Sequence, residues 1–136
     1  MRQDNVLKGS RAEGRFIADC IERGLNIAMP MTPTSYDFLV DTGIKIVKVQ
    51  VKSVSKIDRS SRGEKVKCML THGTKNGHRH YSEKDTDVVA LWVDPVKEWY
   101  IFPIKEVSGK LTISLFPTVK DSKSGYEKFR NAWEFI

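Results

Sequence analysis

The sequence predicts a mixed fold of the α/β (α+β) class, in which a sheet is flanked by helices. Three observations predict it: a helix-periodic segment near the N-terminus, several short strand-like runs in the middle, and a second helix-periodic segment at the C-terminus. A chain of 136 residues has the usual size of one domain and can bury a hydrophobic core without disulfide bonds. Residues 1–136 are therefore expected to form a single domain.

The first half of the chain predicts one helix and two strands. Residues 7–24 repeat apolar side chains at helical spacing and end at Gly24, a common residue just beyond the C-terminus of a helix. After a loop with two prolines, residues 36–40 and 44–53 predict two strands joined by a tight turn at 41–43. A basic loop follows the second of these strands.

The second half predicts further strands and a closing helix. Residues 65–72 predict a strand, the Gly-rich residues 71–86 a long loop or ribbon, and the apolar runs at 87–93 and 98–104 a hairpin. Residues 111–116 add a short strand. The closing helix is expected within residues 125–136, where the apolar residues at helical spacing are Tyr126, Phe129, Trp133 and Ile136.

The cysteines and the first residues indicate a cellular location. Cys20 and Cys68 lie in apolar segments without any paired spacing, and residues 1–10 contain no apolar signal core. We therefore expect a cytoplasmic protein. The longest uninterrupted apolar run, residues 88–93, is far shorter than the roughly 20 residues that cross a bilayer, so no membrane-spanning helix is expected.

The positive charge is concentrated in the middle of the chain. The net charge is +6 and the sequence pI is about 9.4. Nine Lys or Arg and three acids lie between Lys52 and Lys84, so this window carries the whole excess, and the other residues balance. Such a window is typical either of a solvated charged loop or of a surface that binds nucleic acid.

Polar residues interrupt the two expected strands at 36–40 and 44–53. Successive side chains of a strand point to opposite faces, so Gln50 and Lys52 share one face. If Thr42 and Gly43 form a two-residue turn, Asp37 lies opposite Lys48 and diagonally beside Gln50 on this same face. The sequence thus predicts an Asp, an amide and a Lys close together, although a half-exposed polar sheet face would also explain them.

Glu13 lies on the first expected helix, in the arc of apolar side chains that should face the core. A buried carboxylate needs a positive partner, and either a divalent cation shared with Asp37 or the Lys52 ammonium would supply one. The alternative is an ordinary ion pair at the edge of the helix, near an N-terminal turn that favours acids.

These residues resemble the PD-(D/E)xK nuclease superfamily, and most closely its small homing endonucleases encoded by group I introns, which carry Gln in place of the second acid. The resemblance implies a restriction-endonuclease-like core, with a central mixed sheet flanked by helices and a basic loop or ribbon extension. It departs from the motif at Tyr36, which replaces Pro, and at Gln50. The matching stretches span nearly the whole chain: "LKG", "AE", "SYDFLVD", "KVQVKS", "DTDVVALWV", "WYIFPI", "GY" and "AW".

The resemblance also implies roles for individual residues. Asp37 would be the main metal-binding carboxylate, Glu13 the acid on the helix, and Gln50 a neutral oxygen ligand or orienting group. The backbone carbonyl of Val51 would complete the oxygen ligands for Mg²⁺, for which Mn²⁺ is the expected substitute. Lys52 would orient or help to deprotonate the nucleophile and balance the charge of the transition state.

The implied activity is metal-dependent, sequence-specific hydrolysis of phosphodiester bonds in double-stranded DNA, of the homing or restriction type, leaving 5′-phosphate and 3′-hydroxyl ends. Since one such site cuts one strand, a homodimer or homotetramer is expected. Most of the basic residues would meet phosphates and a few Arg would read bases. The expected DNA-binding residues are Lys56, Arg59, Arg62, Lys65, Lys67, Lys75 and Arg79.

Three alternatives remain open from the sequence. A structure-specific nuclease, such as a Holliday junction resolvase, would use the same fold, and the Gln50 substitution would also permit a catalytically inactive DNA-binding module. The third alternative is a zinc site, although its spacing matches no common zinc finger. Its ligands would be Cys68, His72, His78 and His80.

Overall fold

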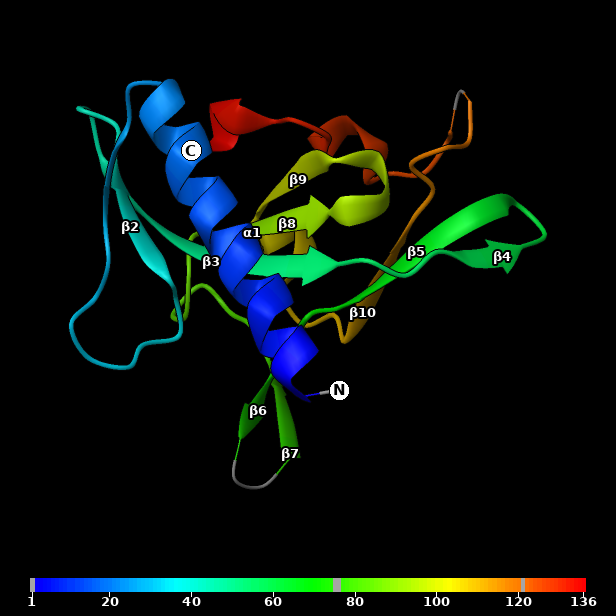
Figure 1. Cartoon of the computed structure of the whole chain (residues 1–136), viewed down its shortest axis with the longest axis horizontal. Coiled ribbons are helices and arrows are strands. Elements are labelled where there is room, and N and C mark those ends of the chain that lie inside the picture. Colours follow the sequence, from blue (N-terminus) through cyan, green and yellow to red (C-terminus); the bar gives the residue numbers. More distant parts are fainter. Residues whose placement is uncertain (1, 75–76, 121) are drawn as a thin grey trace.

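A five-stranded mixed sheet forms the centre of the computed structural model, which describes residues 2–74, 77–120 and 122–136 (Figure 1). Its strand order is β1-β2-β3-β8-β9, and only the β3–β8 pair is parallel. The predicted mixed sheet, with a hairpin formed by its last two strands, is thereby confirmed. The strands are β1 (Asn26–Ala28), β2 (Phe38–Asp41), β3 (Ile46–Val54), β8 (Val88–Val93) and β9 (Glu98–Pro103).

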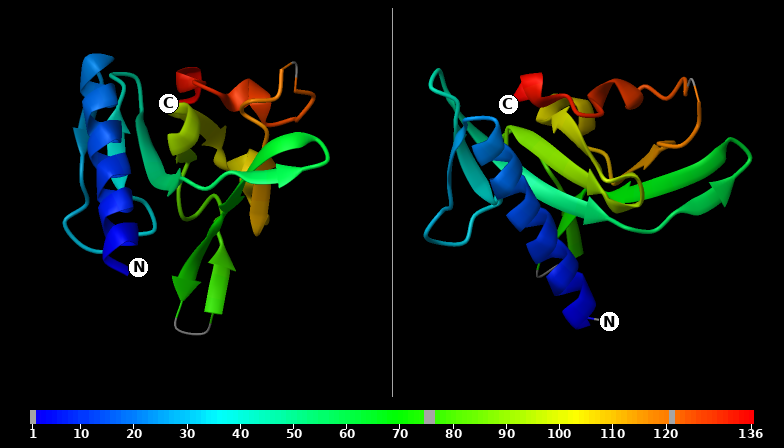
Figure 2. Two further views of the ribbon diagram at one scale, coloured as in Figure 1. Left: turned by 45° about the vertical axis from the view of Figure 1, so that its right-hand side comes forward. Right: turned by 45° about the horizontal axis from the view of Figure 1, so that its top comes forward.

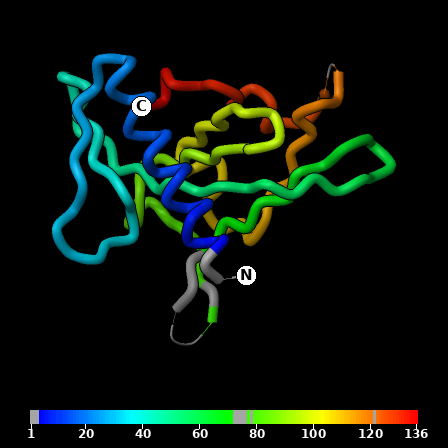
Figure 3. The backbone as a smooth tube through the Cα atoms, viewed as in Figure 1, coloured from blue at the N-terminus to red at the C-terminus, as the bar shows by residue number. Residues whose placement is uncertain are grey.

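One long helix, α1 (Arg2–Glu22), crosses one face of this sheet in front of β3 (Figure 3). It begins before the predicted start at residue 7. Val6 and Leu7 are exposed, so no buried apolar repeat marks where the helix begins. Its C-terminus is where the sequence predicts it. Gly24 has a positive φ of 75°, and the N–H of Leu25 donates to the carbonyl of Cys20 at 2.9 Å, as in a Schellman motif.

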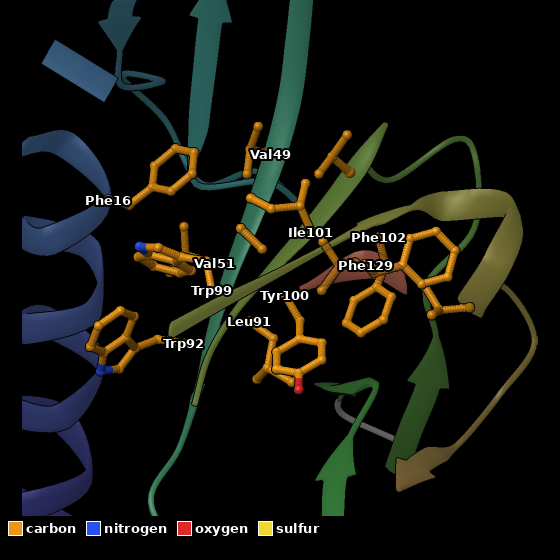
Figure 4. Packing of buried hydrophobic residues seen from close by; sticks show 14 of the residues in the cluster. Phe16, Val49, Val51, Leu91, Trp92, Trp99, Tyr100, Ile101, Phe102 and Phe129 are labelled. Carbon is orange, nitrogen blue, oxygen red and sulfur yellow. The ribbon is translucent and has the colours of Figure 1, made fainter. Parts of the chain in front are cut away.

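Aromatic side chains fill the space between α1 and the sheet. Phe16 is fully buried; its ring stacks on Phe38 at 5.6 Å and on Trp133 at 5.8 Å, and meets the edge of Trp99 at 5.5 Å. Figure 4 shows Phe16 projecting from the helix toward the sheet, on the side of Val49. Because this face is apolar, the intervening residues of β3 must direct their polar side chains to the opposite face.

The β2–β3 hairpin differs in register from the predicted one. Its loop has four residues, Thr42 to Lys45, with the Thr42 N–H donating to the Lys45 carbonyl at 3.0 Å. Phe38 pairs with Val49, which shifts the predicted register by two residues, so the two-residue turn was wrong. Because the shift is even, the residues of β2 keep their predicted faces. Asp37 lies just before β2, and its N–H donates to the Val49 carbonyl at 2.9 Å, so Asp37 does not continue this register.

A second, three-stranded sheet with the order β10-β5-β4 lies beside the central sheet, and a two-stranded ribbon, β6–β7, projects separately (Figure 2). The ribbon is as predicted, whereas residues 58–64, expected as a loop, form most of the β4–β5 hairpin. Gly63, with φ of 113°, makes that hairpin's turn possible. The strands are β4 (Asp58–Ser60), β5 (Gly63–Met69), β6 (Thr71–Thr74), β7 (Gly77–His80) and β10 (Thr112–Leu115).

The predicted closing helix is absent from residues 125–136, where two short 3₁₀ turns take its place. The Arg130 backbone bridges to Tyr100 of β9, and its guanidinium donates to Glu98 at 2.7 Å and to Glu127 at 2.6 Å. The two links to β9, at Tyr100 and Glu98, hold the segment extended at Arg130 and override its helical periodicity. The remaining elements are η1 (Asp94–Val96), α2 (Ile104–Val107), η2 (Glu127–Phe129) and η3 (Trp133–Phe135).

Within the described residues, no helix combines the length and the apolar character needed to span a membrane.

Candidate active site

The candidate site lies where β2 ends and leaves one edge of β3 open. The pairing of β2 with β3 stops at Phe38 and Val49, and in the described part of the chain only β8 pairs with β3 beyond that point. The Val49 carbonyl accepts the N–H of Asp37 at 2.9 Å, so Val51, two residues on, directs its backbone groups to the same edge. One Asp37 carboxylate oxygen accepts the Val51 N–H at 2.8 Å and holds the side chain at this edge.

Two carboxylates meet at the open edge. Burial raises the pKa of Glu13 above its ordinary value, and the charge of Asp37 raises it further, so the helix and the strand bring these side chains together. Burial also raises the pKa of Asp37, while the Val51 N–H and the Lys52 charge act in the opposite direction. The site therefore holds acidic groups whose negative charge is incompletely compensated by the protein.

Gln50 lies on β3 between Val49 and Val51, the two residues whose backbone groups bond to Asp37, and is half-buried. Its side-chain amide donates to the Val51 carbonyl at 3.3 Å, which directs the side chain toward the same open edge. The amide oxygen is an acceptor at the position where the family motif has its second acid. Gln50 thus contributes an oxygen to the cluster without adding a negative charge.

Lys52 lies on the same face of β3, between the central sheet and β5. Its ammonium donates to the backbone carbonyl of Thr71 at 3.2 Å and lies 5.1 Å from the centre of the Tyr81 ring. Burial lowers the pKa of Lys52, and the nearby Cys68 and Asp37 act to raise it. A cation held at low solvent exposure beside Asp37 is suited to interact with a second anion at the open edge.

The donor set fits a hard divalent cation. Glu13 and Asp37 offer carboxylate oxygens, Gln50 an amide oxygen and Val51 a backbone carbonyl, which are the ligand types that Mg²⁺ takes. The raised pKa values of both acids are what an incompletely compensated anionic site produces. In the part of the chain that the structure describes, this site included, no three His, Cys, Asp or Glu side chains are grouped closely enough to hold a metal ion, so the two carboxylates here would depend on the neutral oxygens of Gln50 and Val51.

A basic pocket of about 490 Å³ adjoins the open edge. It lies between the first turns of α1, the C-terminal half of β3 and the end of β5. Four lysines and no acid line it, so the pocket favours an anionic ligand. Its lining residues are Asn5, Lys8, Gly9, Val51, Lys52, Ser53, Val54, Ser55, Lys56, Lys67, Cys68 and Met69.

The other predicted DNA-binding residues do not gather in one place. Lys56 and Lys67 line the pocket beside Lys52, whereas Arg62 and Lys65 line a separate pocket of about 1060 Å³ between the β4–β5 hairpin and residues 112–126. Arg59 pairs with Glu64 across the hairpin and so points to the face opposite Lys65.

The last two predicted basic residues lie in the ribbon. Arg79 on β7 forms an ion pair of 2.7 Å with the buried Asp85, although its side chain remains largely exposed. Lys75 lies outside the described residues. The basic window therefore forms several separate surfaces, of which the pocket at Lys52 is the one next to the acids.

The structure places two of the four candidate zinc ligands. Cys68 is buried in β5, where burial raises the pKa of its thiol to about 11 and keeps it protonated at neutral pH. His80 is exposed on β7, whereas the side chains of His72 and His78 lie outside the described residues. A protonated thiol packed beside Lys52 is a core residue and not a prepared zinc ligand.

Sequence reasoning missed three residues of the site. Lys8 lies one helical turn before the buried Ala12, and that spacing alone could have placed it on the inner side of α1. Thr71 and Tyr81 flank the ribbon, and no local pattern connects them to Lys52. Only the folding of the chain between β5 and β8 brings them there.

The mixed sheet, the helix across it and the polar cluster at the open edge of β3 define a protein of the restriction-endonuclease-like fold. The chain belongs to the PD-(D/E)XK endonuclease family, whose model matches residues 3–136. A solved structure of a bacterial homing endonuclease, I-Ssp6803I, is similar with a TM-score of 0.79 and 26% sequence identity, over 96% of this chain and 90% of that one. A comparison with curated protein sequences finds no match.

The family and the structural neighbour support a nuclease, and DNA is the substrate that the family implies. Nucleases of this family generally use divalent metal ions. The resemblance seen in the motif residues is thereby confirmed at the level of the superfamily and its homing endonuclease branch.

Proposed function

We propose that this protein is a metal-dependent, sequence-specific DNA endonuclease of the homing or restriction type, formed by residues 1–136 as one domain. The observation that carries the proposal is the cluster at the open edge of β3. Asp37 accepts the Val51 N–H at 2.8 Å, Glu13 lies close enough to be affected by the Asp37 charge, and Lys52 borders a basic pocket.

Each residue of the cluster has a distinct part in the proposed reaction. Asp37 and Glu13, with the Gln50 amide oxygen and the Val51 carbonyl, would hold Mg²⁺ or its substitute Mn²⁺. The bound ion supplies Lewis acidity at the scissile phosphate and lowers the pKa of a bound water. Lys52 orients the attacking water and offsets the negative charge that develops on the phosphate as the P–O bond to the 3′ oxygen breaks.

The basic pocket favours a DNA strand that passes along the open edge of β3. Lys8, Lys56 and Lys67 line the pocket beside this edge, and no acid is among the residues that line it, which suits the phosphates beside the scissile bond. Arg62 and Lys65 lie on the second, larger pocket and are proposed to meet phosphates farther along the duplex. Sequence specificity is proposed because two β-hairpins extend from the core and the neighbour of 26% identity is a homing endonuclease.

A homodimer or homotetramer is part of the proposal. The domain holds one cluster of this kind among its described residues, and one cluster cuts one strand. Two copies related by a twofold axis would place two such clusters on the two strands of a palindromic or pseudo-palindromic site. The oligomer is measurable directly by light scattering of the protein with and without DNA.

The proposed substrate is tested by selection. The protein is incubated with a randomised duplex library and with a four-way junction, each with Mg²⁺, Mn²⁺ or EDTA, and the cut molecules are sequenced. Cuts at enriched duplex sites, formed only with a divalent ion, are expected. Cutting of the junction alone would replace the proposal with a resolvase, and DNA binding without cleavage under any ion would replace it with a binding module.

A further inference from the structure

The two strands of the β6–β7 ribbon contact the ammonium of Lys52 at the base of the ribbon. Thr71, the first residue of β6, accepts its hydrogen bond through the backbone carbonyl at 3.2 Å, and Tyr81, the residue directly after β7, presents its ring at 5.1 Å. Thr71 and His80 pair at the base of the ribbon, so these two contacts come from adjacent strands. The base of the ribbon thus contacts Lys52 through the first residue of β6 and the residue after β7.

The base of the ribbon is held firmly in place. Tyr81 and Thr71 are buried, at 4% and 7% exposure. The buried carboxylate of Asp85 accepts the Ser82 N–H at 2.8 Å and the Arg79 guanidinium at 2.7 Å, and so ties β7 to the turn that follows it. A ring packed in this way loses little entropy when it holds a cation, because it is already ordered.

The ring also favours the charged form of Lys52. An aromatic face attracts an ammonium ion electrostatically, and this attraction is strongest where water is excluded. Burial acts in the opposite direction and lowers the pKa of Lys52. Asp37 approaches from the open edge, and Cys68, whose thiol is neutral at ordinary pH, approaches from β5. The ammonium is therefore oriented by the ring, the carbonyl and the Asp37 charge together.

We propose that Tyr81 is a positioning residue for Lys52: its ring, with the Thr71 carbonyl, holds the ammonium toward the open edge of β3 and links the ribbon to the reaction. This inference rests on the proposed function, since the reaction it serves is phosphodiester hydrolysis. DNA that contacts the ribbon would act on both groups that hold Lys52. The Tyr81 hydroxyl also lies near enough to Asp37 and Asp85 for their charges to raise its pKa, whereas the proposed positioning acts through the ring and Lys52.

The test weakens the ring without changing its shape. Tyr81→Phe removes the hydroxyl and serves as the reference, and mono-, tri- and pentafluorophenylalanine at position 81 then reduce the attraction of the ring stepwise. The same series at Phe129, whose ring lies 5.2 Å from the exposed Lys128 ammonium, is the matched control. Two quantities are measured: the single-turnover cleavage rate on the selected duplex, and the ¹H and ¹³C chemical shifts of the Lys52 ε-methylene in DNA-free protein with labelled lysine.

At Tyr81, each step of fluorination should slow cleavage, reaching about 3- to 10-fold for the most fluorinated ring, while the Kd for DNA stays constant. The shifts of the Lys52 ε-methylene should move toward those of an exposed lysine in the same order, because the side chain spends less time against the ring. The Phe129 series should change neither quantity. Slower cleavage without any change in the Lys52 shifts would mean a merely structural role and would overturn the inference, as would no change in either.

The NMR measurement separates this inference from the proposed function. If the wild-type protein cuts no DNA, the proposed function fails, but the order of the Lys52 chemical shifts in the fluorinated series still tests the positioning by Tyr81. If the series leaves those shifts unchanged, the positioning is refuted even in an active nuclease. Circular dichroism of each variant confirms that the fluorinated proteins fold.

Discussion

Asp37→Asn isolates the charge of the central carboxylate. The Asn side chain keeps an oxygen that can accept the Val51 N–H, now 2.8 Å from Asp37, so the variant retains the geometry of the open edge. It removes one of the two negative charges that would hold a divalent cation. We expect Mg²⁺ to stabilise the wild type against thermal unfolding and to leave the Tm of Asp37→Asn nearly unchanged.

The size of the effect follows from binding linkage. A cation at roughly one hundred times its Kd stabilises the folded state by about 2.7 kcal/mol. With an unfolding entropy of about 2.1 cal/mol/K per residue, a chain of 136 residues gains about 9 °C in Tm from that binding. Differential scanning fluorimetry in EDTA and at rising Mg²⁺ or Mn²⁺, without DNA, measures this shift.

In the metal-free protein, Asp37→Asn should not lower the Tm relative to the wild type and should even raise it. Burial raises the pKa of Asp37 above its unfolded value, so the charged carboxylate costs stability once the pH exceeds the folded pKa. In EDTA at pH 8, Asp37→Asn should therefore melt at or above the wild-type Tm. This difference should close as the pH falls and Asp37 takes up its proton.

Asp87 provides a matched control. Its carboxylate also accepts a backbone N–H of β3, that of Lys48 at 2.9 Å, but on the side of β3 that faces β8 and outside the candidate site. Asp87→Asn should keep the full rise in Tm with Mg²⁺. An equal rise in wild type and Asp37→Asn would refute the assignment of Asp37 as a metal ligand.

Three further variants test the site, the core and the pocket. Gln50→Glu adds a carboxylate to the open edge, so its Tm in EDTA should fall below that of the wild type and its rise with Mg²⁺ should exceed the wild-type rise; equal values in both conditions would place Gln50 outside the cation site. Phe16→Ala empties a fully buried position among three aromatic rings and should lower the free energy of unfolding in urea by about 3–5 kcal/mol. Ile21→Ala, at an exposed position of the same helix, should change it by no more than about 0.5 kcal/mol. Similar losses for both variants would contradict the packing of Phe16. Lys67→Gln should reduce the slope of log K against log salt for DNA binding by about 1. Lys105→Gln, a change at an exposed position of α2, should leave this slope unaltered. An unchanged slope for Lys67→Gln would mean that the basic pocket does not contact phosphate.

The site could be predicted from the sequence where strand alternation decides the outcome. Gln50 and Lys52 must share a face of β3, whatever the neighbouring strand does. Asp37 joins them through its bonds to the Val49 carbonyl and the Val51 N–H, which strand alternation does not predict. The actual hairpin loop is two residues longer than expected, and this even shift changes the cross-strand partners of β2 but not its faces.

The C-terminal segment could not be predicted from periodicity. Tyr126, Phe129 and Trp133 repeat as in a helix, yet each packs against the core from an irregular segment. The positive φ of Asn131, 51°, and the ion pair of Arg130 with Glu98 of β9 hold the chain away from helical geometry. Such long-range bonds outweigh a helical preference of a few tenths of a kcal/mol per residue.

The surroundings of Lys52 show the same limit at the site itself. The motif spacing places Lys52, but its ring partner Tyr81 and its carbonyl partner Thr71 come from the two ends of a ribbon. Their positions depend on how β5, the ribbon and β8 pack together, which no local pattern contains. Lys8, by contrast, lies within the predicted helix one turn before the buried Ala12, and that spacing could have placed it at the pocket.

Single-turnover cleavage of the selected duplex by wild type, Asp37→Asn and Lys52→Ala, with Mg²⁺ or EDTA, is the most direct measurement of the proposed chemistry. Wild type should cut both strands only with the metal ion and leave 5′-phosphate ends, and both variants should lose at least about 100-fold in rate while binding the duplex. Cleavage in EDTA, or wild-type rates in both variants, would contradict the assignment of the reaction to the open edge of β3.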